Sequence, residues 1–178
     1  NPICLGDTAI LSVNGLGAGV YTYQWFEVGN PSSIGSDSTL AVNPLVDTDY
    51  EVNVTDTSTT CTSSLFITIN VNSLPTITAN ANPNPICQGD TSTLSAGGGD
   101  TYQWFEVGNP ASIGSGDSIN ISPSVDTDYF VIGTNTATGC SDTGFVSITV
   151  NPLPTVSATA DANPVCLGSS TNLNAFGA

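Results

Sequence analysis

Positive charge is absent from this sequence: its 178 residues include no lysine, arginine or histidine, while 15 aspartates and glutamates give a formal net charge of −15. Affinity for nucleic acid comes chiefly from Lys and Arg side chains that neutralise phosphates. Anionic membrane surfaces attract the same side chains. The composition therefore excludes nucleic acid as a partner and argues against membrane binding, and it leaves divalent cations as the obvious counter-ions.

Long apolar runs and targeting signals are absent as well. No run approaches the roughly 20 residues that span a bilayer, so we expect no direct membrane insertion, and no signal peptide is visible. The sequence has no methionine and opens inside a motif that recurs later, so we interpret both ends as cut ends of a longer protein. Apolar residues still make up 39% of the chain, which is enough to build cores.

Side chains suited to catalysis are scarce. Without His, Lys or Arg, general acid–base chemistry would depend on carboxylates or tyrosines. Glu27 and Glu106 lie in identical local sequences, which indicates a structural role in both places rather than a unique site. We predict that the chain is not an enzyme and has no catalytic residues.

An internal repeat organises the chain. Two segments and one cysteine recur at an offset of 79 residues: YQWFEVGNP at 23–31 and 102–110, VDTDY at 46–50 and 125–129, and Cys61 as Cys140. NPIC at 1–4 recurs at 84–87 and, as NPVC, at 163–166. The repeat predicts three domains: 1–74, which lacks its first strand, 75–153, and 154–178, the N-terminal part of a third repeat.

Short strands with turn signals between them fill each repeat. In Tyr21-Thr-Tyr-Gln-Trp25 the three aromatic side chains share one face of a strand, and no segment has a helical period. We predict strands at 8–14, 21–28, 38–43, 48–55, 64–72, 76–82, 91–96, 101–107, 117–122, 127–133, 143–151 and 157–163. The predicted fold class is all-β, with a sandwich or barrel in each repeat.

A Trp on the third strand and an Asp-x-Asp-Tyr before the sixth resemble the immunoglobulin pattern, in which Tyr50 and Tyr129 would be tyrosine-corner residues. The series Cys-x-Gly-Asp, Tyr-x-Trp, Asp-Tyr-x-Val, Cys and Val-Asn-x-Leu-Pro resembles the immunoglobulin-like and PKD-like repeats of large Bacteroidetes cell-surface proteins. Those proteins include gliding-motility adhesins secreted by the type IX system. The resemblance implies tandem immunoglobulin-like sandwiches, an extracellular or cell-surface location, and neighbouring repeats of the same chain as partners.

Five cysteines in such a chain indicate an oxidising compartment. The internal register predicts the disulfides Cys4–Cys61 and Cys87–Cys140, and a partner for Cys166 that lies beyond the chain. Two alternatives are bridges between neighbouring repeats and free thiols. Zinc is disfavoured, because the sequence has no clustered Cys-x2-Cys pair and no histidine.

Aromatic residues of the third strand divide between two faces. Trp25 and Trp104 share a face with tyrosines, so we predict that they are core residues rather than sugar-stacking ones. Phe26 and Phe105 point to the opposite face, where the following segment covers them or they form an exposed contact patch.

Oxygen-rich motifs supply two further candidate sites. Calcium favours carboxylate ligands, and the candidates are Asp47, Asp49, Asp126 and Asp128; the alternative is ordinary turn chemistry. We expect no other cofactor.

Bacteroidetes surface proteins carry O-glycans on Asp-Ser/Thr-aliphatic or Asp-Ser/Thr-Thr motifs, and the resemblance implies the acceptors Thr8, Ser38 and Ser118.

The function predicted is that of structural spacer or stalk repeats in a secreted cell-surface adhesin or fibre, which hold a distal binding region away from the cell. One alternative is that the repeats themselves bind surface glycans or a protein partner, and an exposed aromatic cluster would favour it. Another is that the chain is a subunit of a self-assembling extracellular filament.

Overall fold

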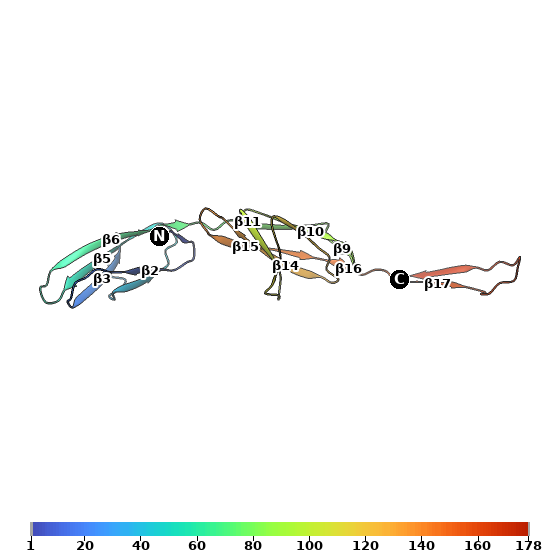
Figure 1. The fold of residues 1–178 in the computed structure, drawn as a ribbon, viewed down its shortest axis with the longest axis horizontal. Helices are drawn as coiled ribbons and strands as arrows, with labels where there is room; N and C mark the ends of the chain where they lie inside the picture. The colour runs from blue at the N-terminus through green and yellow to red at the C-terminus, as the bar shows by residue number, and fades with distance from the viewer. Residues whose placement is uncertain (1, 178) are drawn as a thin grey trace. The chain divides into compact units, whose positions relative to one another are not determined.

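The computed structural model describes residues 2–177, which form strands, turns and loops, without a helix. The described part of the chain therefore offers no helix that could span a membrane. The strands (Figure 1) are β1 Ile3–Cys4, β2 Ala9–Ser12, β3 Tyr21–Glu27, β4 Thr39–Val42, β5 Thr48–Asp56, β6 Thr62–Ile69, β7 Val71–Asn72, β8 Thr78–Asn82, β9 Ile86–Cys87, β10 Ser92–Gly97, β11 Thr101–Glu106, β12 Ser112–Ser115, β13 Ser118–Ile121, β14 Thr127–Thr134, β15 Ser141–Ile148, β16 Val150–Asn151, β17 Val156–Ala160 and β18 Leu173–Gly177. The prediction of an all-β protein is confirmed.

The chain folds into two compact units. Unit 1 contains the residues up to Ile77 together with Gly98–Thr101 and Ile132–Asp142. Unit 2 contains Thr78–Gly97, Tyr102–Val131 and the residues from Thr143 onward. The ends of β14 and β15 nearest Cys140 thus group with unit 1, although the repeat in the sequence assigns them to the second copy.

Unit 1 is built from two facing sheets. Strands β3, β5 and β6 form one antiparallel sheet, and β2 pairs with β4 in the other. The alternation of β5 decides its inner face, because Tyr50, Val52 and Val54 are buried while the residues between them are not. β1 pairs in parallel with β7.

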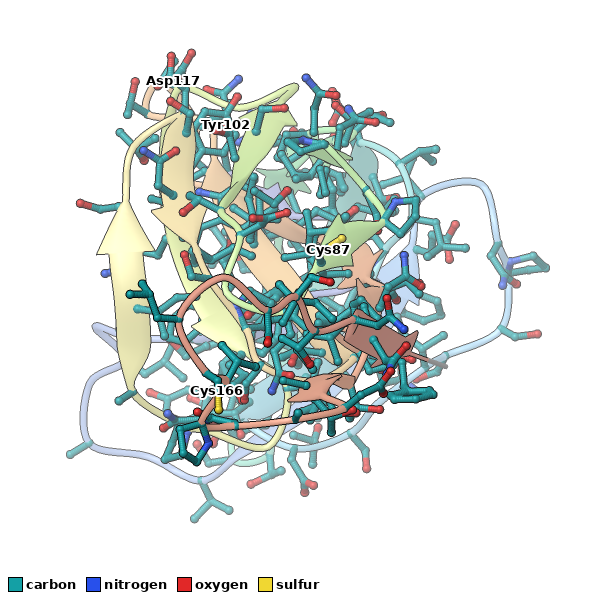
Figure 2. The ribbon with its side chains drawn as sticks, turned by 90° about the vertical axis from the view of Figure 1, so that its right-hand side faces the viewer. Cys87, Tyr102, Asp117 and Cys166 are labelled. Carbon is teal, nitrogen blue, oxygen red and sulfur yellow. A yellow bond between two sulfur atoms is a disulfide. The ribbon has the colours of Figure 1, made fainter. Side chains whose placement is uncertain are left out.

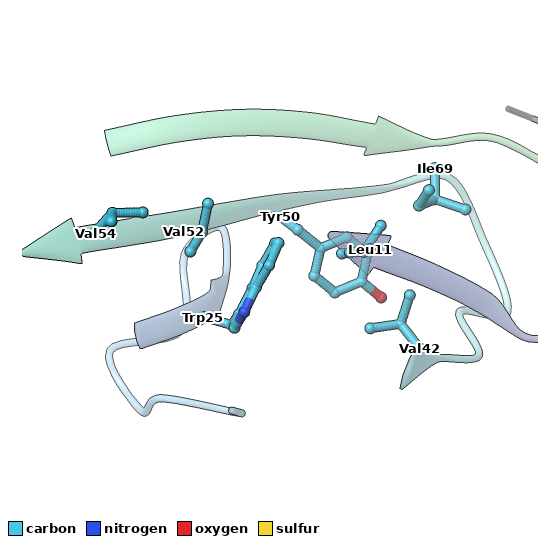
Figure 3. Close-up of a cluster of buried hydrophobic side chains, with 7 residues drawn as sticks. All are labelled: Leu11, Trp25, Val42, Tyr50, Val52, Val54 and Ile69. Carbon is cyan, nitrogen blue, oxygen red and sulfur yellow. The ribbon is translucent and has the colours of Figure 1, made fainter. Parts of the chain in front are cut away.

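The core of unit 1 lies between these sheets (Figure 3). Trp25 is 2% exposed and sits among Leu11, Val42, Tyr50, Val52, Val54 and Ile69. Its indole N–H donates to the carbonyl oxygen of Asp37 at 2.9 Å, so the one polar atom of the ring is satisfied inside the core. The prediction of a core tryptophan is confirmed.

Unit 2 repeats the plan with one more strand in each sheet. The smaller sheet has the order β13-β10-β8, and the larger one has the order β12-β11-β14-β15. Trp104 and Leu94 are fully buried between them, and the Trp104 indole N–H donates to the carbonyl oxygen of Gly116 at 3.1 Å. The buried hydroxyl of Ser92 donates to the carbonyl oxygen of Pro83 at 2.7 Å.

The predicted strand 64–72 is interrupted, and so is its counterpart 143–151. β6 pairs with β5 as far as Ile69, and after Asn70 the chain pairs with β1 instead. The Asn70 carbonyl oxygen accepts the N–H of Ile3 at 2.9 Å, while the Val71 N–H donates to Asp47 at 2.7 Å. The segment 64–72 therefore pairs first with β5 and then with β1. The equivalent later pairing in unit 2 is between β16 and β9. These pairings form the short strands β1 and β9, which were not predicted.

Leu94 provides a test of the core of unit 2, since its side chain is 0% exposed. Leu94→Ala should lower the free energy of unfolding by about 2–5 kcal/mol, because the methyl groups leave a cavity that rigid neighbours cannot fill. Denaturant unfolding followed by tryptophan fluorescence measures the change. Val125, which is 67% exposed, supplies the control: Val125→Ala should alter the value by no more than about 0.5 kcal/mol. Equal effects of the two substitutions would contradict this core.

Candidate functional site

The cysteines do not pair as the register predicted. Cys4 is bonded to Cys140, with a distance of 5.6 Å between the Cα atoms and a sequence separation of 136 residues. Cys61, Cys87 and Cys166 are free and exposed, and Figure 2 shows Cys87 and Cys166 without a bond to another sulfur. Cys4–Cys140 is instead a bridge between neighbouring repeats, which was one of the two alternatives to the predicted pairs.

The predicted pairs Cys4–Cys61 and Cys87–Cys140 are wrong because the partners lie at opposite ends of the strands. Cys4 lies beside Asn72 in the β1–β7 pair. Cys61 precedes Asn72 by 11 residues along an extended strand, and 11 residues at about 3.3 Å each span about 35 Å. A disulfide needs Cα atoms within about 7 Å. The same distance argument separates Cys87, beside Asn151, from Cys140. A partner for Cys166 beyond the chain stays a prediction.

A row of three phenylalanines marks the outer face of the larger sheet of unit 2. Phe105 on β11 stacks on Phe130 on β14, with ring centroids 4.9 Å apart and an interplanar angle of 10°. Phe130 in turn contacts Phe145 on β15, at 6.2 Å and 40°. Phe105 and Phe130 are half-buried, and Phe145 is 70% exposed. We call these three residues the phenylalanine row.

The row faces away from the core because alternation places the neighbouring residues inside. Trp104 and Val131, adjacent to Phe105 and Phe130, are both fully buried. The predicted outward direction of Phe105 is thus confirmed. Phe105 is half-buried against Phe130, and of the three rings only Phe145 is exposed, so an exposed contact patch at Phe105 stays a prediction.

Unit 1 lacks the continuous row. Phe26 lies opposite Glu51, and Glu51 lies opposite Phe66. A carboxylate therefore stands between two phenylalanines, where unit 2 has the ring of Phe130. The sequence held a signal for this difference, because Glu51 and Phe130 follow the two identical VDTDY segments.

The phenylalanine row presents flat apolar rings on a protein without cationic side chains. Such a surface can stack against the apolar face of a sugar ring or against apolar side chains. It presents no cationic side chain that could bind a phosphate or sulfate group. The chemistry of the row is therefore that of a neutral-ligand or apolar contact.

The candidate calcium ligands are engaged in other bonds. Asp47 and Asp126 accept the backbone N–H groups of Val71 and Val150, each at 2.7 Å. Asp49 accepts the hydroxyl of Thr68 at 2.6 Å. Among residues 2–177 no group of three or more Asp, Glu or Cys side chains is arranged to hold a metal ion. Calcium binding at these aspartates and at Asp128 stays a prediction.

The predicted glycan acceptors are all accessible. Thr8, Ser38 and Ser118 are exposed; Thr8 immediately precedes β2, Ser38 immediately precedes β4 and Ser118 opens β13. Exposure next to a loop is what a modifying enzyme needs, and O-glycosylation at these three positions stays a prediction.

Two buried tyrosines have perturbed acid–base behaviour. Tyr50 and Tyr129 are each 4% exposed. Burial raises the pKa of Tyr50, and the negative charge of Glu27, its neighbour across the ladder, raises it further. Burial also raises the pKa of Tyr129, with a smaller contribution from Glu106, while a hydrogen bond with Thr127 acts in the opposite direction. Burial and the nearby negative charge both disfavour the charged phenolate form of these tyrosines.

These tyrosines should make the fold sensitive to alkali. Because their folded pKa values lie above the ordinary value of about 10, the folded state holds protons that the unfolded chain releases. The free energy of unfolding should therefore be unaffected by these groups below about pH 10 and fall as the pH rises further. No lysine titrates in the same range. Denaturant titrations between about pH 9 and 12 should show a smaller fall in Tyr50→Phe and Tyr129→Phe than in the unsubstituted protein. An unchanged pH profile in both variants would refute the assignment.

One family match covers the second repeat. Residues 73–152 match the family described as Ig-like domain CHU_C associated. The segment contains all strands from β8 to β16, so the match and the sandwich agree on an immunoglobulin-like repeat domain. The predicted fold class, an all-β protein of immunoglobulin-like sandwiches, is confirmed. This fold and the Cys4–Cys140 disulfide fit an extracellular or secreted protein.

Solved structures to which this chain has a low similarity include immunoglobulin and fibronectin modules. The N-terminal four Ig domains of Dscam1 isoform 1.9 are 15% identical, with a TM-score of 0.34, over 85% of this chain and 43% of that chain. The fibronectin(III)-like modules of Clostridium thermocellum CbhA are 11% identical, with a TM-score of 0.42, over 84% and 89%. Murine CEACAM1b is 14% identical, with a TM-score of 0.38, over 85% and 96%. This chain thus spans less than half of the Dscam1 chain, and no curated protein matches it.

Proposed function

We propose that the chain is a non-enzymatic spacer segment of a secreted cell-surface protein, of the adhesin type that its repeat motifs resemble. The observation that carries the proposal is the bond between Cys4 and Cys140, which joins a residue of the first repeat to a residue of the second. A spacer must keep its length when its two ends are pulled apart. The bond gives this chain a means of doing so.

The bond diverts tension around most of the fold. A force applied to the two chain ends passes along the residues before Cys4, across the two sulfur atoms, and along the residues after Cys140. The chain between the two cysteines, which contains β2 to β14, then carries no load. Hydrogen-bonded strands separate under force much more easily than a covalent bond breaks. The disulfide therefore protects the core around Trp25 from mechanical unfolding, whereas β15 of unit 2 stays in the loaded part of the chain.

Single-molecule stretching from end to end tests this proposal. With the bond intact, the 136-residue separation between Cys4 and Cys140 should stay hidden from extension. Cys4→Ser should release about 450–490 Å of additional contour length, since each extended residue contributes about 3.3–3.6 Å. Cys140→Ser should release the same length. Addition of a reducing agent to the unsubstituted protein should reproduce the effect.

The free cysteines supply the matched control. Cys61→Ser removes a thiol that forms no bond within the chain, so its extension should equal that of the unsubstituted protein. Release of the full contour length by the oxidised, unsubstituted protein at the force that unfolds Cys4→Ser would overturn the protected-spacer proposal.

The phenylalanine row supports a second role, that of a binding module for surface glycans. Three contacting rings on an outer sheet face form a platform of the kind on which sugar rings stack. The formal charge of −15 repels acidic polysaccharides, which restricts the ligand to neutral ones.

Calorimetric titration with cellohexaose, a neutral oligosaccharide, tests this second role. Phe145→Ala removes the most exposed ring of the row and should weaken binding at least about tenfold, in line with the loss of one stacked ring. Phe130→Glu, which gives unit 2 the unit 1 residue, should abolish binding. Phe66 is 68% exposed in unit 1 and has no ring beside it across the ladder, so Phe66→Ala should leave the affinity unchanged. Absence of binding to the unsubstituted chain, or equal losses in Phe66→Ala and Phe145→Ala, would reject the glycan platform.

A further inference from the structure

Asp128 lies beside the phenylalanine row on the outer face of unit 2. It precedes Phe130 by two residues on β14, and residues two apart on a strand share a face. Their Cα atoms are about 6.6 Å apart, because a strand rises about 3.3 Å per residue. Tyr129 between them is buried, so Asp128 and Phe130 both point away from the core. An exposed carboxylate therefore borders the row.

The carboxylate of Asp128 accepts no hydrogen bond from any residue between 2 and 177. Its counterpart in unit 1, 79 residues earlier, is Asp49, which accepts the hydroxyl of Thr68 at 2.6 Å. The residue 79 positions after Thr68 is Ser147, and within the same described range its hydroxyl does not donate to Asp128. The aspartate is thus engaged in unit 1 and open in unit 2.

A second contrast between the units concerns the strand position two residues beyond Glu51 and Phe130. In unit 1 this position is Asn53, whose side-chain oxygen accepts the hydroxyl of Ser64. In unit 2 it is Ile132, which has no polar side-chain atom. Two polar side chains of β5 are therefore satisfied by hydroxyl groups of β6, whereas β14 presents apolar side chains next to the open carboxylate of Asp128.

An aromatic ring beside an open carboxylate suits the chemistry of a sugar. The apolar face of a sugar ring stacks on an aromatic ring, while the sugar hydroxyl groups project from its rim as hydrogen-bond donors. An ionised carboxylate only accepts, and its two oxygens can accept two donors at once. Hydrogen bonds to a charged acceptor are also roughly twice as strong as those between neutral groups.

We propose that Asp128 positions a neutral glycan on the phenylalanine row by accepting hydrogen bonds from two adjacent hydroxyl groups of the stacked sugar. The ligand class is thereby narrowed to neutral polysaccharides whose adjacent hydroxyls are free, such as cellulose chains. The inference rests on the glycan-binding role proposed above, and it adds the side chain that selects and orients the ligand.

Calorimetric titration of the full chain with cellohexaose in a buffer that contains EDTA tests the inference. EDTA removes metal ions, so the carboxylate has to contact the sugar directly. Asp128→Ala should weaken binding at least about tenfold, since hydrogen bonds to charged groups are among the stronger ones. Asp128→Asn keeps the size and one acceptor oxygen but loses the charge, and it should weaken binding by a smaller factor.

Asp49 supplies the matched control, because its carboxylate is already engaged by Thr68. Asp49→Ala removes the same charge from the chain as Asp128→Ala and should leave the affinity unchanged. Equal losses in the two variants would show an effect of overall charge and would overturn the inference.

The results also separate this inference from the role on which it rests. A loss of affinity in Phe145→Ala with none in Asp128→Ala would leave the glycan-binding role in place and overturn the part assigned to Asp128. Failure of the unsubstituted chain to bind cellohexaose would reject both. Losses in Phe145→Ala and Asp128→Ala, with Asp49→Ala unaffected, are the result that we expect.

Discussion

No carboxylate in this protein can pair with a cationic side chain, and this constraint shapes the sandwich. Asp47 and Asp126 accept the N–H groups of Val71 and Val150 at the points where the chain leaves the larger sheet of each unit. At such a crossing the backbone loses its ladder partner, and an unpaired buried N–H is costly. The carboxylate supplies the acceptor, so the chain can turn to pair with β1 in unit 1 and with β9 in unit 2. The position of Cys4 and Cys87 at one end of each repeat follows from that crossing.

The crossing also explains why the disulfide joins different repeats. A strand of about ten residues keeps Cys4 and Cys61 at opposite ends of the same sandwich, so neither can close a bond within it. Each repeat thus has one cysteine at each end. The Cys4–Cys140 bond joins a cysteine of the first repeat to a cysteine of the second, so it links successive repeats of the sequence.

Local patterns in the sequence predicted the local structure well. The alternation of Tyr21, Tyr23 and Trp25 identified the inner face of β3, and both tryptophans are core residues as predicted. The interruption after Asn70 could not be predicted, because it depends on a hydrogen bond between residues 24 positions apart. The cysteine pairs failed for a related reason: the repeat shows which cysteines are equivalent, but not at which end of a strand each one lies. The phenylalanine row could not be predicted because it depends on how three strands align with one another. The contrast between Glu51 and Phe130, however, was visible in the sequence.

That contrast shows how the outer face of a repeat can change without loss of its fold. Residue 51 and residue 130 both point away from the core, so either a carboxylate or a phenylalanine is compatible with the same sandwich. The ring at position 130 contacts Phe105 on one side and Phe145 on the other, and thereby joins two isolated rings into one platform. The carboxylate at position 51 keeps Phe26 and Phe66 apart. Because the inner face carries the stability and the outer face is free to vary, neighbouring repeats of one chain can present different outer surfaces.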